Sequence, residues 1–434
     1  MTTELAKQTI YQADFRRSMA ESNQPIWLKT IRKHAFQFFT GNGFPTPRNE
    51  EWKYTNVAPV AKEEFSFEAG TVGDEIIKDL IYEEAAANTF VFVDGRLKKG
   101  VFTGDDNFTA LTLNDVFKDE RLVKIAETHF GKALDFERNG FTALNTAFME
   151  EGIFLHISRD AQIETPVHLL FISTDGKINF PRVFVFCEKG SNASLIENFV
   201  SAGAGRSFSN SVTEIFLEDN ARLTHHRIQK ENVDSFNIGA TQALLGRDSY
   251  YNSTNINFGA ALSRHDVGVK FTAEGGECFV DGLYMTGGSQ HADTHSVIDH
   301  AVPHCTSHQT YKGVLGESSH AVFNGKVLVR ENARGTDAQQ SNKNLLLSND
   351  ARVDTKPQLE IFNDDVKCAH GATVGQLADE EVFYLLSRGL HMELARNLLT
   401  YGFAEEVISK IDVASIKDEL DQAVLHRLEA TLEA

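Results

Sequence analysis

The segment that decides the fold runs from residue 191 to residue 279, where a short turn-and-strand pattern occurs four times. It reads SNASL at 191–195, DNARL at 219–223, RDSYY at 247–251 and GGECF at 275–279. The third positions of these copies, 193, 221, 249 and 277, are each 28 residues apart. A fixed period of turns and strands is typical of a solenoid, in which each coil buries its apolar face only against its neighbours. The pattern therefore predicts a β-helix.

The same texture extends over residues 151–376, where short β-branched and aromatic runs alternate with Gly, Asn, Asp and Ser. This region has no convincing helical periodicity and is too long for one small sandwich. A later copy of the pattern, NDARV at 349–353, falls out of phase. The alternative is that polar-then-apolar turns recur by chance in some other β fold.

The region before the solenoid, residues 1–150, mixes helical and extended segments. Residues 26–39 carry apolar side chains at helical spacing, and Gly41, Gly43 and Pro45 follow as stop signals. Residues 111–134 also predict mostly helix. Residues 89–93, TFVFV, predict a strand that ends at the turn pair Asp94-Gly95.

The region after the solenoid, residues 377–434, is predicted to be helical. Asp379 is expected to be the N-cap of the first helix, and further helices are expected at 391–401, 404–411 and 413–432. The last of these carries one apolar face, which usually packs on the protein's own core and would otherwise bind a partner. That face consists of Ile416, Leu420, Val424 and Leu428.

Charge and cysteine content exclude several classes of protein. The chain has 42 basic and 61 acidic residues, a net charge of −19, which argues against binding nucleic acid or acidic lipid surfaces. Its four cysteines form no CxxC pair and fit neither a zinc ribbon nor a disulfide framework, so a reducing compartment is expected. No apolar run approaches the length of a membrane span, and the start of the chain has no signal-peptide pattern. We therefore expect a cytoplasmic protein.

Cys368 and His370 form the first candidate site. In an extended strand, residues two apart point to the same side, so a thiolate and an imidazole would face one partner. Such a pair can bind iron or zinc, but two ligands do not complete a metal site. From the residues alone, a buried structural cysteine beside a satisfied histidine is an equally good interpretation.

A second candidate site is the histidine-rich segment 290–311. On a strand, two of its histidines would share one face and three would share another, which suggests a metal site. Pro303 interrupts any single strand, so we favour structural histidines that bond across coils. The five histidines are His291, His295, His300, His304 and His308.

Templates for several enzymes are absent from the sequence. There is no GxSxG elbow, no HExxH and no phosphate-binding P-loop. Any ATP-dependent role would therefore need a partner that binds the nucleotide.

Several blocks together resemble the SufD family over nearly the whole chain. SufB is the paralogue, and SufB-like chains carry Glu-His-Glu where this chain has 368–371, CAHG. They are also usually longer, with an N-terminal cysteine cluster that this chain lacks. Both differences favour SufD. The blocks are GFPTP at 43–47, EEWKYT at 50–55, and residues 299–313, 332–347 and 357–375.

The resemblance implies a mainly β fold, a right-handed parallel β-helix flanked by helical N- and C-terminal regions. It also implies a non-catalytic scaffold for iron–sulfur cluster assembly and iron acquisition, in complex with a SufB-like paralogue and a SufC-like ATPase. Carried over by position, Cys368 and His370 lie at the SufB interface, where iron or a nascent cluster would bind. No cofactor is expected to bind stably to the chain alone. The C-terminal helices match the SufC-docking region, with docking residues Phe383, Leu386, Leu390, Leu394 and Leu398.

Two other classes of function are alternatives. A β-helix carbohydrate-active enzyme would use clustered acids such as Asp293 and Asp299. A stand-alone metal-binding protein would use the histidines of segment 290–311. The sequence leaves open whether the isolated chain forms a homodimer.

Overall fold

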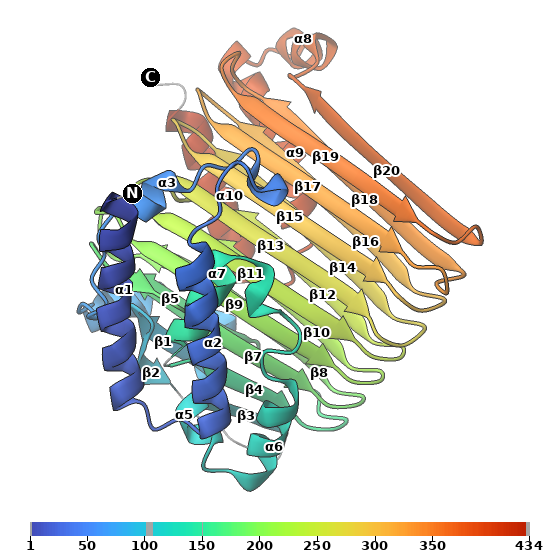
Figure 1. Cartoon of the computed structure of the whole chain (residues 1–434). Coiled ribbons are helices and arrows are strands. Elements are labelled where there is room, and N and C mark those ends of the chain that lie inside the picture. Colours follow the sequence, from blue (N-terminus) through green and yellow to red (C-terminus); the bar gives the residue numbers. More distant parts are fainter. Residues whose placement is uncertain (1, 101–106, 150, 431–434) are drawn as a thin grey trace.

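The computed structural model describes residues 2–100, 107–149 and 151–430. Helices and short strands come first, and α10 comes last (Figure 1). The elements before the solenoid are α1 (Thr2–Glu21), α2 (Ile26–Asn42), η1 (Glu50–Trp52), α3 (Ala58–Lys62), α4 (Asp74–Asp79), η2 (Glu83–Asn88), β1 (Thr89–Val93), β2 (Arg96–Gly100), β3 (Phe108–Thr112), α5 (Leu113–Val116), α6 (Glu120–His129), η3 (Phe136–Arg138) and α7 (Gly140–Phe148).

The following strands alternate between two long sheets, so that each coil adds one strand to each sheet. The predicted mainly β fold, a parallel β-helix with helical ends, is confirmed as a solenoid of about eight turns. Its strands are β4 (Ile153–Ile157), β5 (Val167–Ser173), β6 (Ile178–Asn179), β7 (Arg182–Cys187), β8 (Asn192–Ser201), β9 (Phe208–Leu217), β10 (Arg222–Gln229), β11 (Phe236–Leu245), β12 (Tyr250–Asn257), β13 (Leu262–Phe271), β14 (Glu277–Thr286), β15 (His291–His300), β16 (Thr306–Leu315), β17 (His320–Val329), β18 (Thr336–Leu346), β19 (Arg352–Ile361) and β20 (Val366–Gly375).

The first sheet has the strand order β2-β1-β5-β8-β10-β12-β14-β16-β18-β20, and the second has β19-β17-β15-β13-β11-β9-β7-β4-β3. From β5 onward every pairing is parallel, whereas β1 pairs with β2 and β3 pairs with β4 in antiparallel fashion. Strands that precede residue 151 therefore extend both sheets of the solenoid.

The repeated sequence pattern corresponds to one turn that recurs in each coil. In each turn one residue has a positive φ. In most of these turns its N–H donates to the carbonyl of a residue in the next coil, as Asn220 does to Arg247 and His304 does to Arg334. Gly, Asn and Asp adopt this left-handed conformation most readily, which explains their recurrence. The positive-φ residues are Asp160, Gly190, Asn220, Asp248, Gly275, His304 and Gly335.

The strict period of 28 residues is wrong, although the inferred solenoid is correct. Residues that occupy the same place in successive coils are 27 to 31 residues apart, because the turns differ in length. The copy at 349–353 is out of phase for another reason, because it leads into β19 of the second sheet, whereas the four earlier copies lead into strands of the first sheet. The equivalent residues are Asn192, Arg222, Tyr250, Glu277, Thr306, Asp337 and Lys367.

Most of the interior of the solenoid is one apolar core, and buried polar side chains occupy some rungs. Two tyrosines fill space left by glycines on neighbouring strands. Gly282 lies beside Tyr311 in the register, and Gly313 lies beside Tyr284. A Cβ atom at Gly282 would lie 2.1 Å from Tyr311 Cε1, so this position tolerates no side chain.

Helices cover the outer faces of the two sheets. Figure 1 shows α1 and α2 on one face, with α9 and α10 behind the strands on the opposite face. Phe141 of α7 and Trp52 of η1 pack with Phe208 and Phe236 of the second sheet. The last helices, α8 (Asp379–Ser387), α9 (Met392–Ile408) and α10 (Ala414–Ala430), complete the fold.

The apolar face predicted for the last helix packs on the protein's own core. Ile416, Leu420, Val424 and Leu428 are buried with Ile228 and Leu283 of the first sheet and their neighbours. Residues 431 and 432, the end of that predicted helix, lie outside the described residues. Within the described ranges no helix is long and apolar enough to cross a membrane.

Several predicted helix boundaries are wrong. Residues 111–134 begin with the end of β3 and contain the short helices α5 and α6. The two helices predicted at 391–401 and 404–411 are one continuous helix, α9, because Gly402 is accommodated within it. Asp379 is the first residue of α8, and the preceding Ala378 provides no side-chain cap.

We predict that Gly282→Ala destabilises the protein, because the new methyl group collides with the Tyr311 ring. Overpacking of this kind typically costs about 1–3 kcal/mol of unfolding free energy. Urea unfolding followed by circular dichroism measures the change. Gly402→Ala is the control, since nothing lies within 4 Å of its added Cβ. Equal stability of Gly282→Ala and wild type would contradict this account of the packing.

Candidate functional site

The solenoid ends at two strands, β19 and β20, which we call the open end. β19 pairs with β17, and β20 pairs with β18. Among the described residues no strand pairs with the outer edge of either one. The open end therefore presents two unpaired backbone edges and the cross-section of the interior.

Cys368 and His370 lie on β20, as the sequence predicts for a pair on one strand. The register puts Cys368 beside Ala338 and His370 beside Gln340, and both neighbours are buried in the interior. In-register parallel neighbours point the same way, so both side chains continue interior rows of the solenoid. Cys368 is half-buried, and His370 is exposed.

Burial raises the pKa of the Cys368 thiol above its usual range. The side chain packs against a small apolar cluster that includes Val327 and Ala338. The thiol is therefore protonated at neutral pH in the isolated chain. A metal ion that binds this sulfur must displace the proton, so binding releases a proton and strengthens with pH.

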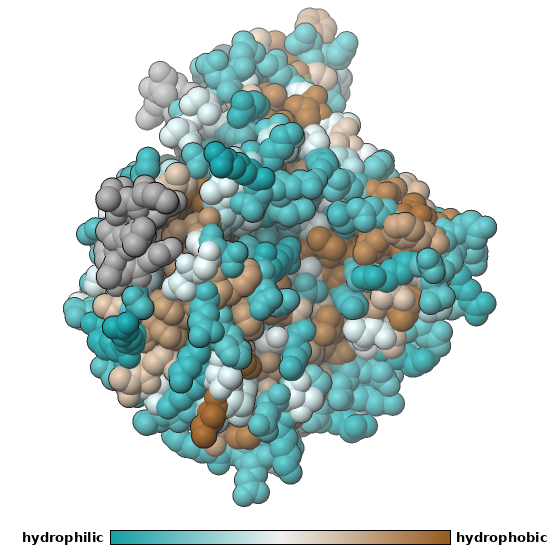
Figure 2. All heavy atoms as spheres, in the orientation of Figure 1, coloured by the Kyte–Doolittle hydropathy of each residue, from teal (hydrophilic) through white to brown (hydrophobic). Residues whose placement is uncertain are grey.

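The surface beside this pair carries exposed apolar side chains. Ile361 at the end of β19, the adjacent Phe362, and Val374 on β20 are 40%, 61% and 47% exposed. Figure 2 shows hydrophobic side chains on the surface near this end of the molecule, whereas most of the visible face is hydrophilic. Exposed apolar side chains beside an unpaired strand edge are typical of an interaction surface.

The five histidines of segment 290–311 do not form one site. His291 and His295 share the outer face of β15, as expected. The prediction that the other three share a face is wrong, because a turn separates them into two sheets. His300 ends β15, His304 lies in the turn, and His308 belongs to β16. In the described part of the chain no group of three or more His, Cys, Asp or Glu side chains is arranged so that it could hold a metal ion.

Asp293 and Asp299, the acids considered for a carbohydrate-active enzyme, are each paired with an arginine. Arg264 Nη1 donates to Asp293 Oδ2 at 2.8 Å. Arg330 donates through Nε and Nη2 to the two Asp299 oxygens, at 2.8 and 2.9 Å. Neither carboxylate is free to act with a second acid, so the geometry does not favour that alternative.

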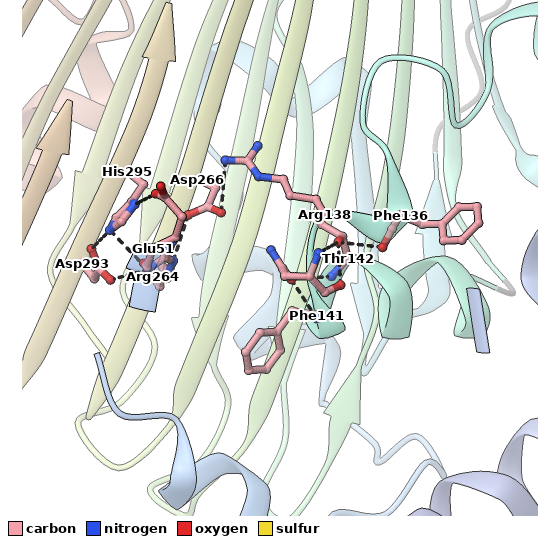
Figure 3. Close-up of polar contacts among 10 residues, drawn as sticks. Glu51, Phe136, Arg138, Phe141, Thr142, Arg264, Asp266, Asp293 and His295 are labelled. Carbon is pink, nitrogen blue, oxygen red and sulfur yellow. Dashed lines mark hydrogen bonds and ion pairs between the residues drawn. The ribbon is translucent and has the colours of Figure 1, made fainter. Parts of the chain in front are cut away.

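Outer-face residues of β13 and β15 form a buried charge network with η1. Figure 3 shows Arg264, Asp293 and His295 gathered around Glu51. His295 Nε2 lies 3.1 Å from Asp293 Oδ1, and His295 Nδ1 lies 3.2 Å from Glu51 Oε2. The Arg264 guanidinium lies 3.8 Å from the centroid of the Trp52 ring. These contacts hold the N-terminal region on the solenoid.

The network extends toward η3 on one side and toward His291 on the other. Arg138 Nη2 lies 3.5 Å from Asp266 Oδ2. Figure 3 draws this ion pair as a dashed line. Thr55 Oγ1 donates to Asp293 Oδ2 at 2.5 Å and lies 2.8 Å from His291 Nε2. Sequence reasoning missed this network, because a local pattern does not reveal which distant segment a strand will face. The alternation Arg264-x-Asp266 was the available signal.

The pKa values of the two histidines of this network, His291 and His295, are shifted in opposite directions. Burial alone would lower the pKa of His295, but Asp293 and Glu51 outweigh it and raise the pKa to about 9. Burial lowers the pKa of His291 to about 4. Burial would also raise the pKa of Asp293, but Arg264 and His295 hold it well below its usual range. His295 is therefore cationic and His291 neutral at pH 7.

The predicted docking residues of the C-terminal helices are exposed to different degrees. Phe383, Leu394 and Leu398 are exposed, whereas Leu386 and Leu390 are half-buried. Sequence reasoning missed Tyr384 and Met392, which are 57% and 51% exposed beside them. Their signal was weak, because both lie between the predicted docking residues, which are three or four positions apart. We call these seven residues the α8–α9 face.

We predict that His295→Gln flattens the pH dependence of stability above pH 6.5. A histidine with a raised pKa stabilises the fold fully below pH 6.5, and that contribution is lost as the pH rises through about 9. Thermal unfolding of wild type should therefore weaken between these values more than that of the variant. Identical pH profiles for the two proteins would contradict a charged His295.

Comparisons with known proteins fit this architecture. Residues 170–403 match the family model described as SUF system FeS cluster assembly, SufBD core domain, and residues 3–169 match the SufBD protein N-terminal region. A Synechocystis protein named as an iron–sulfur cluster assembly SufBD family protein is 33% identical over 97% of this chain and 95% of its own length. The iron–sulfur cluster assembly protein SufD of Escherichia coli is 31% identical over 89% of each chain.

The two family models together cover the helices before the solenoid, the solenoid itself, α8 and most of α9, and they end before α10. A Mycobacterium leprae relative, also named as a SufBD family protein, is 35% identical over 63% of this chain and 71% of its own length. The chain belongs to the SufBD family of iron–sulfur cluster assembly proteins.

Proposed function

We propose that this chain is a SufD-type scaffold subunit, which binds a SufB-like paralogue through its open end and a SufC-like ATPase through its α8–α9 face. The observation that carries the proposal is the position of Cys368 and His370. They lie on the last strand of a solenoid whose final edges are unpaired. A paralogous chain docked there would cover the pair and could complete a ligand set.

The chemistry of the pair suits iron as cargo. A thiolate and an imidazole are both ligands for iron, and four ligands are usual for a cluster iron. Cys368 and His370 supply two ligands, so the partner must supply the others. Because burial keeps the thiol protonated, the isolated chain should hold iron weakly. Loading is therefore a property of the assembled complex, and the cytoplasm, where thiols stay reduced, suits it.

The absence of a phosphate-binding motif supports an ATPase partner. The sequence contains no P-loop, so energy from ATP would have to enter through another chain. Residues 388–391 connect the exposed α8 to α9, and the second half of α9 is anchored on the first sheet. Lys312 of β16 pairs with Glu406, and Lys410 Nζ lies 2.8 Å from Asp281 Oδ2 of β14. A partner bound at the α8–α9 face would thus act on β16 and β14, which lie two and three places before β20 in the first sheet.

We predict that His370→Ala and Cys368→Ala lower cluster loading without preventing assembly. Each variant is co-expressed with the paralogue and the ATPase, and iron and acid-labile sulfide are measured per purified complex. Both should fall by at least half, because one ligand is lost. His34→Ala, an exposed histidine on α2, is the control. Wild-type loading in both site variants would show that the pair has no role at the interface.

We also predict that Leu394→Glu combined with Leu398→Glu abolishes co-purification with the ATPase. Both leucines are exposed on α9, so the charges should disturb docking more than folding. Leu425→Glu is the matched control, because Leu425 is a similarly exposed leucine on α10. Retention of the ATPase by the double variant would place its docking surface elsewhere.

A further inference from the structure

A cavity of about 590 Å³ lies between the end of α6 and the outer face of the second sheet, far along the sheet from the open end. Its walls come from the residues around the end of α6 and from the ends of β7, β9 and β11. We call it the α6 groove. It is lined principally by His129, Lys132, Arg159, Phe186, Lys189 and Phe216.

The floor of the α6 groove is aromatic. Phe186 and Phe216 are 5% and 7% exposed, and the His129 ring centroid lies 5.0 Å from each of their centroids. Burial lowers the pKa of His129, so the ring is neutral at pH 7 and adds to the apolar floor. Flat, partly covered aromatic rings of this kind favour a planar apolar group.

The rim of the α6 groove is cationic. Lys132, Arg159 and Lys189 are exposed, and in the described part of the chain none of them forms an ion pair. Two acids share the rim but are held by backbone amides. Glu218 accepts the Lys189 N–H at 2.9 Å, and Asp219 accepts the Arg247 N–H at 3.3 Å. Three cations beside two carboxylates leave this groove with a net positive charge in a chain whose net charge is −19, which favours an anionic ligand.

We propose that the α6 groove binds a small organic anion with a planar aromatic body and a phosphate group. The aromatic body would lie on the floor, and the phosphate would meet the cationic rim. Arginine and lysine are the usual side chains for phosphate, and the cavity has the size of typical small-molecule sites. This site is independent of the proposed scaffold role, because it shares no residue with the open end or the α8–α9 face.

Isothermal titration of the full chain with 2-naphthyl phosphate tests the proposal. Inorganic phosphate and 2-naphthol are titrated separately, and the combined molecule should bind at least tenfold more tightly than either. The variant Lys132→Glu, Arg159→Glu, Lys189→Glu should lose tenfold or more in affinity. The matched variant Lys33→Glu, Lys62→Glu, Lys78→Glu changes three exposed lysines elsewhere and should bind as wild type does.

A salt titration of the wild-type chain keeps the test decisive if the rim variant misfolds. Affinity for 2-naphthyl phosphate should fall several-fold between about 50 and 500 mM NaCl, because the rim is exposed to screening. Absence of saturable binding, salt-independent binding, or equal affinity in a folded rim variant would overturn the proposal. Binding of 2-naphthol as tight as that of its phosphate would also overturn it, since the rim would then play no part.

Discussion

Each coil of this solenoid satisfies its backbone groups and its interior side chains only by stacking on the next coil. In-register parallel pairing joins every strand from β5 to β20 to its neighbours in the same sheet, and the positive-φ turns bond to one another along one corner. In a structure built this way, the strands of the last coil have no further coil to pair with. The open end, with Cys368 and His370 on its final strand, follows from that constraint.

The edge strands at the two ends of the first sheet, β2 and β20, differ in charge. At the start, β2 pairs antiparallel with β1 and carries Arg96, Lys98 and Lys99, and charges of this kind discourage further pairing. At the other end, the ten residues of β20 include only one basic residue, Lys367, and no acid. Val374 near the end of β20 and Phe362 in the turn before β20 add exposed apolar surface there. The β20 end of the sheet is therefore less protected against edge pairing than the β2 end, which is consistent with the proposed interface.

The sequence predicted the features that depend on local periodicity. The turn pattern identified the solenoid, and the period of two in strands correctly placed Cys368 and His370 on one side of β20. The strict 28-residue phase failed because turns of unequal length are compatible with the same strand register. The prediction of a shared histidine face is wrong because Pro303 and His304 lie in a turn, so that His300 and His308 belong to different sheets.

Contacts between distant segments could not be predicted in the same way. Nothing in the local pattern of η1 indicates that Glu51 meets His295, 244 residues later, or that Arg264 lies over Trp52. The exposure of Phe383, Leu394 and Leu398 was anticipated only through family resemblance, since an apolar helical stripe normally predicts burial. Such a stripe on α10 is indeed buried.

Hydrogen–deuterium exchange of β20 tests the central claim most directly. In the isolated chain, the amides of Val366–Gly375 that point away from β18 should exchange quickly, because they line an unpaired edge. In the complex with the SufB-like paralogue and the ATPase, the same amides should exchange at least about tenfold more slowly. Unchanged exchange along β20, with protection confined to another surface, would contradict the assignment of the open end as the paralogue interface.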